Sequence, residues 1–550
     1  MNSMWKFNYD MAEVTDKSKF LKKNLTELER ESSLIICQTL ERAICYYDFF
    51  DAEVKCQLLV LIKKMQKCNY CRRCCKNASW WDGFTSVVNE FEKMTTIKKM
   101  PKSDLETRVA QIVPNYLSAN SFLQPPVDML MVAKHFNDKS IPYIFIDNRI
   151  EKLSVEKLYK SIETCKYIII TSTPYDHIQN YFLDYRLKYV FMLVNYIKAQ
   201  DDRKVIIFCG AHGSVRPDIV FKECGADYVI RGEYDFIVDK VVEKLIKNEK
   251  IISKNILEHS SFSKDNLELY SHNVEAYSER KDVMPFYDDI DFANYYGDIY
   301  VNGALKKVRN YAAILASRGC MNNCSFCFNF FGNKVRYRSP ESVVDEMEYM
   351  QARGVKRIFF IDATFTQNKE WTSNICEEII KRGLKIPWSA ETRCDCVDRD
   401  LLFLMSVANC DALWFGVESY CDKVLQNNYK YNNNKIGFNA VEICRSNGIQ
   451  PLQFIMIGAP GESVSSINET IAGLEKLEAS YVESAMVATP RFGTKYYEWA
   501  KKQYDKLGED FYSLMGVRGL VKNEMTPQIL SQALNRINNR EFNKLSLSNG

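Results

Sequence analysis

The chain has 550 residues, of which 46% are hydrophobic and 26% charged, and its net charge is +3. This length suggests two to four domains, and the composition is that of an ordinary globular protein. A near-neutral chain without the roughly 18 to 20 consecutive apolar residues of a membrane span gives no support for nucleic acid or a membrane as the main partner. The opening residues contain no apolar signal core, and the 19 cysteines are odd in number and mostly scattered. We therefore expect a reduced, cytoplasmic protein.

Residues 1–100 form a first, helical region, because apolar residues recur there at helical spacing without strand alternation. Four cysteines of this region lie close together: Cys68, Cys71, Cys74 and Cys75. Their C-x2-C-x2-C spacing could hold a second iron–sulfur cluster or zinc. On a helix, however, Cys68, Cys71 and Cys75 share one face, so a packing role is equally open.

In residues 101–250, short apolar strands alternate with helices. The expected strands are Arg108–Val113, Tyr143–Asp147, Tyr167–Thr171, Val205–Cys209 and Asp227–Ile230. The expected helices are Val127–Phe136, Val155–Glu163, Arg186–Lys198, Pro217–Glu223 and Phe236–Lys247. This alternation predicts a doubly wound parallel sheet, whose ligands bind at the carboxyl ends of the strands.

Residues 251–310 are polar and without a clear period, so we expect a connector there. Strands and helices alternate again over residues 311–490. The expected strands are Ala313–Ala316, Arg357–Ile361, Pro387–Ala390, Ala412–Phe415, Gln453–Ile457 and Ser484–Val487. Six such units predict a partial (β/α)6 barrel, since a full eight-unit barrel needs about 250 residues. For residues 491–550 we expect a helical, charged tail.

Three cysteines spaced C-x3-C-x2-C follow the first of these strands: Cys320, Cys324 and Cys327. Three thiolates are one fewer than a fully Cys-ligated 4Fe–4S cluster uses, so the fourth iron would be open to a non-protein ligand. The alternatives are a zinc site or three unrelated cysteines, but zinc commonly takes four ligands in two separated pairs. No second pair stands at a usual distance from this motif.

This spacing resembles the signature of the radical S-adenosylmethionine (SAM) enzymes, in which the open iron binds SAM. The resemblance covers about residues 310–500. Its segments between residues 338 and 462 place polar groups after successive barrel strands, as in the branch that pairs the barrel with a cobalamin (B12) domain. It implies SAM contacts from Phe326, Asp362, Glu391, Arg393, Glu418, Ser419 and Gly458. In that reading Glu418 meets the ribose, Arg393 and Glu391 lie near the SAM carboxylate and amine, and Phe326 and Gly458 lie near the adenine. The family's usual Gly-Gly-Glu segment is not evident, because Asp362-Ala-Thr stands at the second strand. Asp362 and Arg393 could instead cap strand ends or pair with one another.

Residues 101–250 resemble the flavodoxin/Rossmann-like cobalamin-binding domain of the same branch. The implied cobalamin contacts are Asn115, Tyr116, Thr171, Ser172, Thr173, Gly210, His212, Gly213, Gly232 and Glu233. The Asp-x-His-x-x-Gly element that supplies an axial histidine in many cobalamin proteins is absent. We therefore expect His212 to meet the periphery of the cofactor and the lower axial position to lack a protein histidine. A flavodoxin-like domain without cobalamin is the alternative.

The resemblance implies a 4Fe–4S cluster, SAM and cobalamin as cofactors. The implied activity is methylation of an unactivated carbon of a peptide or secondary metabolite through a 5′-deoxyadenosyl radical and methylcobalamin. An external low-potential donor, such as flavodoxin or ferredoxin, would supply electrons. Two alternatives stay open at this point: a cyclase or ring-rearrangement enzyme that uses cobalamin without methyl transfer, and a non-catalytic cobalamin or SAM sensor.

Overall fold

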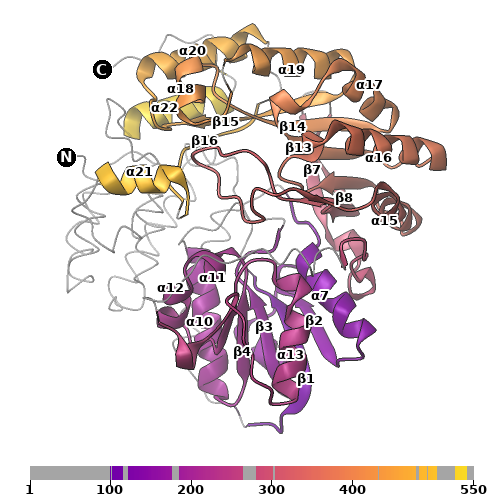
Figure 1. The fold of residues 1–550 in the computed structure, drawn as a ribbon, viewed down its shortest axis with the longest axis vertical. Helices are drawn as coiled ribbons and strands as arrows, with labels where there is room; N and C mark the ends of the chain where they lie inside the picture. The colour runs from indigo at the N-terminus through magenta and orange to yellow at the C-terminus, as the bar shows by residue number, and fades with distance from the viewer. Residues whose placement is uncertain are drawn as a thin grey trace.

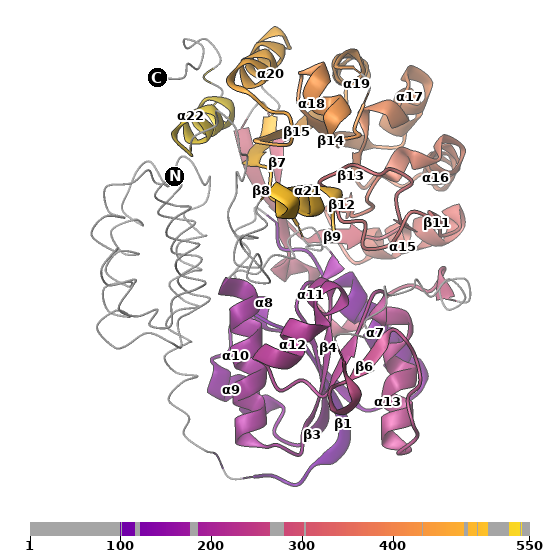
Figure 2. The ribbon, with the colours of Figure 1, turned by 60° about the vertical axis from the view of Figure 1, so that its left-hand side comes forward.

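The computed structural model describes residues 100, 102–115, 122–175, 185–263, 280–301, 304–431, 433–477, 482–491, 493–503, 527–539 and 541. The expected N-terminal helical region and its four-cysteine group lie outside these residues. The described part contains two large sheets, one in the upstream half and one in the downstream half (Figures 1 and 2). None of its helices is long and apolar enough to cross a membrane.

The upstream sheet has six strands in the order β2-β1-β3-β4-β5-β6. The strands are β1 (Glu106–Val113), β2 (Tyr143–Asp147), β3 (Cys165–Thr171), β4 (Val205–Cys209), β5 (Tyr228–Ile230) and β6 (Ile256–Glu258). The first five are parallel, and β6 pairs antiparallel with β5 at the edge. Three consecutive residues of β3, from 168 to 170, are isoleucines with no exposed surface, as expected for a parallel strand covered on both faces.

Helices cover both faces of this sheet. They are α7 (Val127–Asp138), α8 (Asn148–Glu151), α9 (Val155–Ser161), α10 (Tyr185–Gln200), α11 (Ala211–Val215), α12 (Pro217–Glu223) and α13 (Val238–Ile246). Helices α7 and α13 lie on one side, and α10 and α12 on the other (Figure 1). The structure therefore confirms the doubly wound α/β fold predicted for this half.

The downstream sheet is a curled, all-parallel half-barrel of six strands in the order β16-β15-β14-β13-β12-β9. The strands are β9 (Tyr311–Ile314), β12 (Arg357–Phe360), β13 (Trp388–Thr392), β14 (Cys410–Glu418), β15 (Gln450–Ile457) and β16 (Val482–Val487). The helices are α15 (Pro340–Ala352), α16 (Lys369–Arg382), α17 (Arg399–Val407), α18 (Asp422–Asn427), α19 (Lys435–Ser446), α20 (Val464–Lys476), α21 (Lys495–Gln503) and α22 (Pro527–Asn538). The predicted partial (β/α)6 barrel is thus confirmed.

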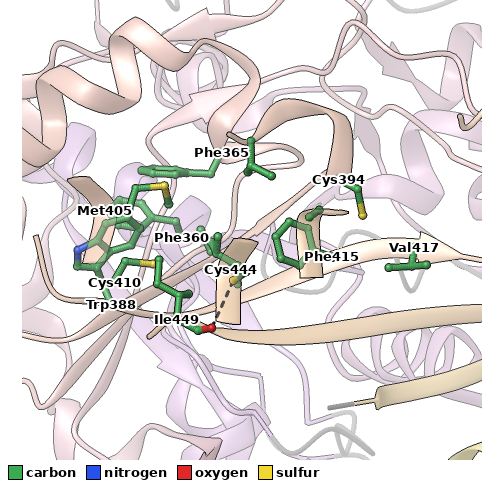
Figure 3. Close-up of a cluster of buried hydrophobic side chains, with 14 of the residues drawn as sticks. Phe360, Phe365, Trp388, Cys394, Met405, Cys410, Phe415, Val417, Cys444 and Ile449 are labelled. Carbon is green, nitrogen blue, oxygen red and sulfur yellow. Dashed lines mark hydrogen bonds between the residues drawn. The ribbon is translucent and has the colours of Figure 1, made fainter. Parts of the chain in front are cut away.

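Alternate residues of the barrel strands face two different cores. On the outer face, large side chains such as Phe360, Trp388 and Phe415 pack beneath the helices (Figure 3). On the inner face, Phe359 and Trp414 meet at a ring-centroid distance of 4.8 Å in one aromatic cluster. The inner face of the sheet therefore carries a cluster of aromatic and aliphatic side chains, and the polar groups described below lie near the carboxyl ends of the strands.

The stretch expected to be a connector contains more order than its sequence suggested. Strands β7 (Tyr296–Val301) and β8 (Ala304–Arg309) pair as an antiparallel hairpin. Gly297 is needed there, because a Cβ atom at this position would lie 2.6 Å from the Tyr311 ring. Two short strands, β10 (Ser317–Arg318) and β11 (Arg336–Tyr337), also pair antiparallel and were not predicted.

Candidate functional site

The three cysteines of the C-x3-C-x2-C motif lie on the loop between β10 and β11, whose pairing closes the base of the loop. The N–H of Cys320 donates to the Gly332 carbonyl at 3.1 Å, and the Asn329 amide donates to the Cys320 carbonyl at 2.7 Å. Gly319 has φ +99°, and a Cβ there would lie 2.6 Å from the Lys334 carbonyl oxygen. Glycine thus lets the two arms of the loop approach, and hydrogen bonds from the Cys320 backbone and the Asn329 side chain hold the loop together.

The thiols of this loop influence one another. Cys320 and Cys324 are partly buried, and Cys327 is exposed as a residue. Loss of water around its thiol, followed by the charges of Cys324 and Cys320, raises the pKa of Cys327 to about 12. Among the described residues, no three His, Cys, Asp or Glu side chains already form a metal-binding group. Three thiols on one open loop fit a cluster with one free iron better than a closed four-ligand zinc site.

Polar side chains from the segment after β12 surround the Cys320 thiol. The hydroxyl of Thr364 lies 3.5 Å from Cys320 Sγ, and Oε1 of Gln367 lies 3.6 Å from it. The Asn322 amide donates to the same sulfur at 3.4 Å and to Gln367 at 3.2 Å. Such outer contacts orient metal-binding side chains and adjust the properties of the bound group.

Arg393, just after β13, contacts the second thiol. Its Nη1 lies 3.2 Å from Cys324 Sγ. Its Nε and Nη2 donate to the Asp395 carboxylate at 2.9 and 2.8 Å. The sequence placed Arg393 near the SAM carboxylate or in a pair with Asp362, whereas the structure pairs it with Asp395 and directs it toward a cysteine of the motif.

Two carboxylates and one ammonium lie near the carboxyl ends of β13 and β14. Lys430 Nζ lies 3.1 Å from Glu418 Oε1, and both side chains are largely buried. Glu418 has φ +68°, an uncommon backbone conformation for a residue with a side chain. Burial, and then the charge of Glu418, raises the pKa of Glu391 to about 7. This group therefore offers carboxylates and an ammonium. Both suit a ligand that carries an amine, a carboxylate and ribose hydroxyls, as SAM does.

Phe326 and Gly458 lie beside this charged group. Phe326 packs against a buried apolar cluster that includes Met456 and Tyr496, and Lys430 Nζ lies 5.9 Å from the centre of its ring. Gly458 has φ +78° directly after β15, and its carbonyl accepts a hydrogen bond from the Tyr496 hydroxyl at 3.3 Å. An aromatic face beside a glycine turn is suited to a flat heterocycle.

Asp362 and Ser419, also expected to contact the cofactor, have partners within the protein. Asp362 accepts from the Ala316 N–H at 3.1 Å and from the Ser317 hydroxyl at 2.5 Å. Burial raises its pKa to about 6. The Ser419 hydroxyl lies 2.8 Å from that of Thr470. Asp362 thus joins the end of β12 to the segment before the cysteine loop, which is the strand-capping alternative that the sequence left open.

In the upstream sheet, the loops after β3 and β4 form a close-fitting group. His212 Nδ1 lies 3.1 Å from the Ser172 hydroxyl, and the Thr173 hydroxyl accepts from the Ala211 N–H at 2.8 Å. Gly210 has φ +100°, and a Cβ there would lie 2.7 Å from Ser172 Oγ and 2.9 Å from the Thr173 nitrogen. The two loops therefore touch only because residue 210 is a glycine.

The other residues expected to contact cobalamin differ in burial and in hydrogen bonding. Thr171 is fully buried, and its hydroxyl has no hydrogen-bond partner in the described part of the chain. Gly213 packs on the sheet, since a Cβ there would lie 2.9 Å from Val229. The Gly232 N–H donates to the Ser214 hydroxyl at 2.7 Å. Asn115 is partly buried. Tyr116 lies outside the described residues.

Glu233 joins the upstream domain to the barrel. Its carboxylate accepts from Arg336 at 2.6 Å and from Arg318 at 2.9 Å, and all three side chains are buried. Arg318 also donates to Asp235 at 2.5 Å, which accepts from the Tyr175 hydroxyl at 2.8 Å. The expected contact of Glu233 with cobalamin stays a prediction, and the structure gives this residue a second role between the two sheets.

Sequence reasoning missed the residues that act through distant partners: Tyr175, Asp235, Arg318, Arg336, Gln367 and Lys430. One signal was available for Arg318, because it stands two residues after an apolar run and two before the cysteine motif, and a buried arginine needs an acidic partner. Lys430 gave no such signal, since its partner Glu418 is separated from it by helix α18.

The chain resembles known proteins in both halves. Residues 314–473 match the Radical SAM superfamily. The chain is 29% identical over 301 residues to an uncharacterized methyltransferase of Pyrococcus horikoshii, covering 54% of this chain and 62% of that protein. It is 24% identical over 374 residues to the anaerobic magnesium-protoporphyrin IX monomethyl ester cyclase of Rubrivivax gelatinosus, covering 66% of this chain and 64% of that enzyme. Less than two thirds of either relative is therefore covered.

A structural match extends across both sheets. A structure of the radical SAM methyltransferase TsrM from Kitasatospora setae, with cobalamin and a [4Fe–4S] cluster bound, matches with a TM-score of 0.56 at 14% identity. The match covers 72% of this chain and 78% of that one. At this identity the likeness concerns the fold. The chain thus has the two-sheet fold of that enzyme, and its residues 314–473 match the Radical SAM superfamily.

Proposed function

We propose that the chain is a cobalamin-dependent radical SAM enzyme that methylates an unactivated carbon. The observation that carries this proposal is the buried network of Arg318, Glu233 and Asp235. Arg318 lies two residues before Cys320, and its acidic partners follow the glycine loop after β5. The network therefore joins the cysteine loop directly to the upstream loops that resemble a cobalamin site.

In this proposal the barrel holds the first two cofactors. Cys320, Cys324 and Cys327 would hold a 4Fe–4S cluster, as three soft thiolates suit iron. Glu391 and Glu418 would hold the amine and ribose of SAM, and the ring of Phe326 and the turn at Gly458 would receive its adenine. Together the bound cofactors would supply a carbon radical on the substrate and a methyl group to quench it, chemistry that no side chain provides.

The upstream loops would hold cobalamin. Gly210 lets the loops after β3 and β4 touch at Ser172 and Thr173, and the buried Thr171 hydroxyl beside them has no hydrogen-bond partner in the described part of the chain. His212 is held by Ser172 through Nδ1. We keep the prediction that the lower axial position lacks a protein histidine. Alanine at position 212 should then weaken cobalamin binding only modestly.

Methylation is the activity we favour, because one relative is named a methyltransferase and the matching structure is that of a methyltransferase. The alternative is a cyclase or ring-rearrangement enzyme, which the named activity of the Rubrivivax relative supports. The substrate would be a peptide or a small secondary metabolite. An external low-potential protein, such as a flavodoxin or ferredoxin, would provide the electron.

The proposal can be tested before a substrate is known. The chain would be reconstituted anaerobically with iron, sulfide and hydroxocobalamin, reduced with titanium(III) citrate, and given SAM labelled in its methyl group. We expect label on the protein-bound cobalamin and release of 5′-deoxyadenosine. Release of deoxyadenosine without label on the cobalamin would favour the cyclase alternative. If neither product forms, the chain would be a non-catalytic sensor. A later gain of one methylene unit in a substrate would establish methylation.

A further inference from the structure

Arg393, just after β13, is held in place by several neighbouring groups. Its side chain is 6% exposed, and Asp395 accepts two hydrogen bonds from its Nε and Nη2. Nη2 also donates to the Lys430 carbonyl at 2.7 Å. The guanidinium carbon lies 4.9 Å from the centre of the Tyr431 ring, a cation–π distance. Four contacts thus fix the plane of the guanidinium.

These contacts leave little of Arg393 for a carboxylate ligand. A guanidinium has five N–H donors. The single N–H of Nε and both of Nη2 go to Asp395 and the Lys430 carbonyl, and one of Nη1 faces Cys324 Sγ at 3.2 Å. One donor remains, so the two-pronged grip by which arginine binds carboxylates is not available without breaking these contacts.

We propose that Arg393 is a positioning residue that donates to the Cys324 thiolate and raises the reduction potential of the iron–sulfur cluster. This inference rests on the proposed function, because it requires a cluster on the three cysteines. Reduction adds one electron, and its negative charge spreads partly onto the sulfur ligands. A fixed cationic donor at a sulfur stabilises that added charge, and hydrogen bonds to sulfur are among the means by which proteins set cluster potentials.

The surrounding charges support an effect from Arg393 itself. Asp395 pairs with the opposite edge of the guanidinium, and its side chain is 37% exposed, so water screens its charge more than that of Arg393. Two further cations act on the loop: Lys430, which is paired with Glu418, and Arg491, whose charge opposes the rise in the pKa of the Cys327 thiol. Cys320 contacts the uncharged side chains of Thr364, Gln367 and Asn322. The charge-assisted contact is therefore at Cys324.

The test is a reductive titration of the reconstituted chain, followed by the electron paramagnetic resonance signal of the reduced cluster. We expect Arg393→Gln to shift the midpoint to a more negative value by at least 59 mV, a tenfold change in a one-electron equilibrium. Asp395→Asn removes the neutralising carboxylate and should shift it in the positive direction. Arg393→Lys, which keeps the charge but not the fork, should fall between Arg393→Gln and the unchanged chain.

Arg357 provides a matched control. It is a buried arginine paired with Asp411, but it begins β12, at the amino end of the sheet and away from the cysteine loop. Arg357→Gln should leave the midpoint unchanged. An unshifted midpoint in Arg393→Gln that still carries four irons would overturn the inference. If that variant cannot hold iron, Asp395→Asn decides: a positive shift supports the inference, and no shift overturns it.

Equilibrium dialysis with SAM separates the two roles considered for Arg393. We expect Arg393→Gln to bind SAM within about threefold of the unchanged chain, while its midpoint shifts. Lost SAM binding with an unshifted midpoint would overturn the inference in favour of a SAM contact. If the unchanged chain gives no cluster signal at all, the proposed function itself fails, a result distinct from either of these.

Discussion

Arg318 and Asp235 form a buried ion pair, 2.5 Å long, that joins the cysteine loop to the upstream domain. Arg318 lies two residues before Cys320, and its guanidinium stacks 4.2 Å from the centre of the Phe236 ring. Asp235 also accepts from Tyr175, two residues after Thr173. A movement of either set of loops must therefore be transmitted to this pair, so we expect the two proposed cofactor sites to be coupled.

Replacing Arg318 should test this coupling. Arg318→Met leaves Asp235 and Glu233 buried with fewer counter-charges, and removal of one partner of a buried ion pair costs about 3–5 kcal/mol. We expect urea unfolding to show a loss of this size and cobalamin occupancy to fall together with iron content. Arg353→Gln, which removes an exposed pair with Asp288, should change neither. Full cobalamin and iron loading of Arg318→Met would refute the coupling.

Gly210 should be required for the upstream site. Gly210→Ala combines a strained φ with a Cβ 2.7 Å from Ser172, so we expect the two loops to separate and cobalamin occupancy to fall at least tenfold. Gly354→Ala is the control, because residue 354 also has a positive φ but an added Cβ there meets nothing within 4 Å. Bound cobalamin is read from its visible absorbance after gel filtration. Equal occupancy in both variants would show that the close approach at Gly210 is not needed.

Cys324→Ala should remove the cluster. The variant lacks one of three thiolates and leaves Arg393 without its sulfur acceptor, so we expect loss of the brown absorbance and of nearly all SAM cleavage. Cys224→Ala removes a buried thiol at the end of α12 in the upstream domain and should retain the iron content. Deoxyadenosine formation by Cys324→Ala would mean that the ligands have been assigned to the wrong residues.

Glu391 should make the stability of the apoprotein depend on pH. Its pKa is about 7 in the folded chain, against an ordinary value of 4.5. Between these values the folded state keeps a proton that the unfolded state has released, so the free energy of unfolding falls as pH rises from 4.5 to 7. Burial also raises the pKa of Glu462 to about 7, which adds a decline of the same sign.

Urea unfolding at pH 5, 6, 7 and 8 checks this expectation. Glu391→Gln should lose less stability across that range than the unchanged chain, while keeping the part due to Glu462. Glu378→Gln is the control, because Glu378 is paired at the surface with Lys381 and Arg382 and the pKa of its carboxyl is lowered by them. An unchanged slope in Glu391→Gln would show that Glu391 does not keep its proton in the folded state.

Local sequence was enough to predict two strands of the upstream sheet with their bounds, the edge strand β2 and the central strand β4. The buried strand β4 is a short apolar run between turns, as is typical of parallel strands covered on both faces. The hairpin of β7 and β8 was missed because its residues are mixed in polarity. Its order comes from pairing and from the close contact of Gly297 with Tyr311, which belongs to the next sheet.

The site shows the same division between local and distant information. The cysteine motif could be recognised from the sequence because its three residues are close together in the chain. The partners of Arg393 and Glu233 could not, because Cys324 lies 69 residues from Arg393, and Arg318 lies 85 residues from Glu233. The first pair depends on how two loops of the barrel meet, and the second on how the upstream sheet meets the barrel; neither periodicity nor spacing in the sequence contains this information. The proposed SAM and cobalamin contacts stay predictions.

The most direct test is to count iron and cobalamin per chain after anaerobic reconstitution with iron, sulfide and hydroxocobalamin. The account predicts about four irons and one cobalamin, the content of one 4Fe–4S cluster and one B12 site. About eight irons would indicate a second cluster and would make Cys68, Cys71, Cys74 and Cys75 the first residues to replace. Four irons without cobalamin would contradict the cobalamin-dependent function. The barrel would then be a radical SAM domain, and the upstream domain would have a function other than cobalamin binding.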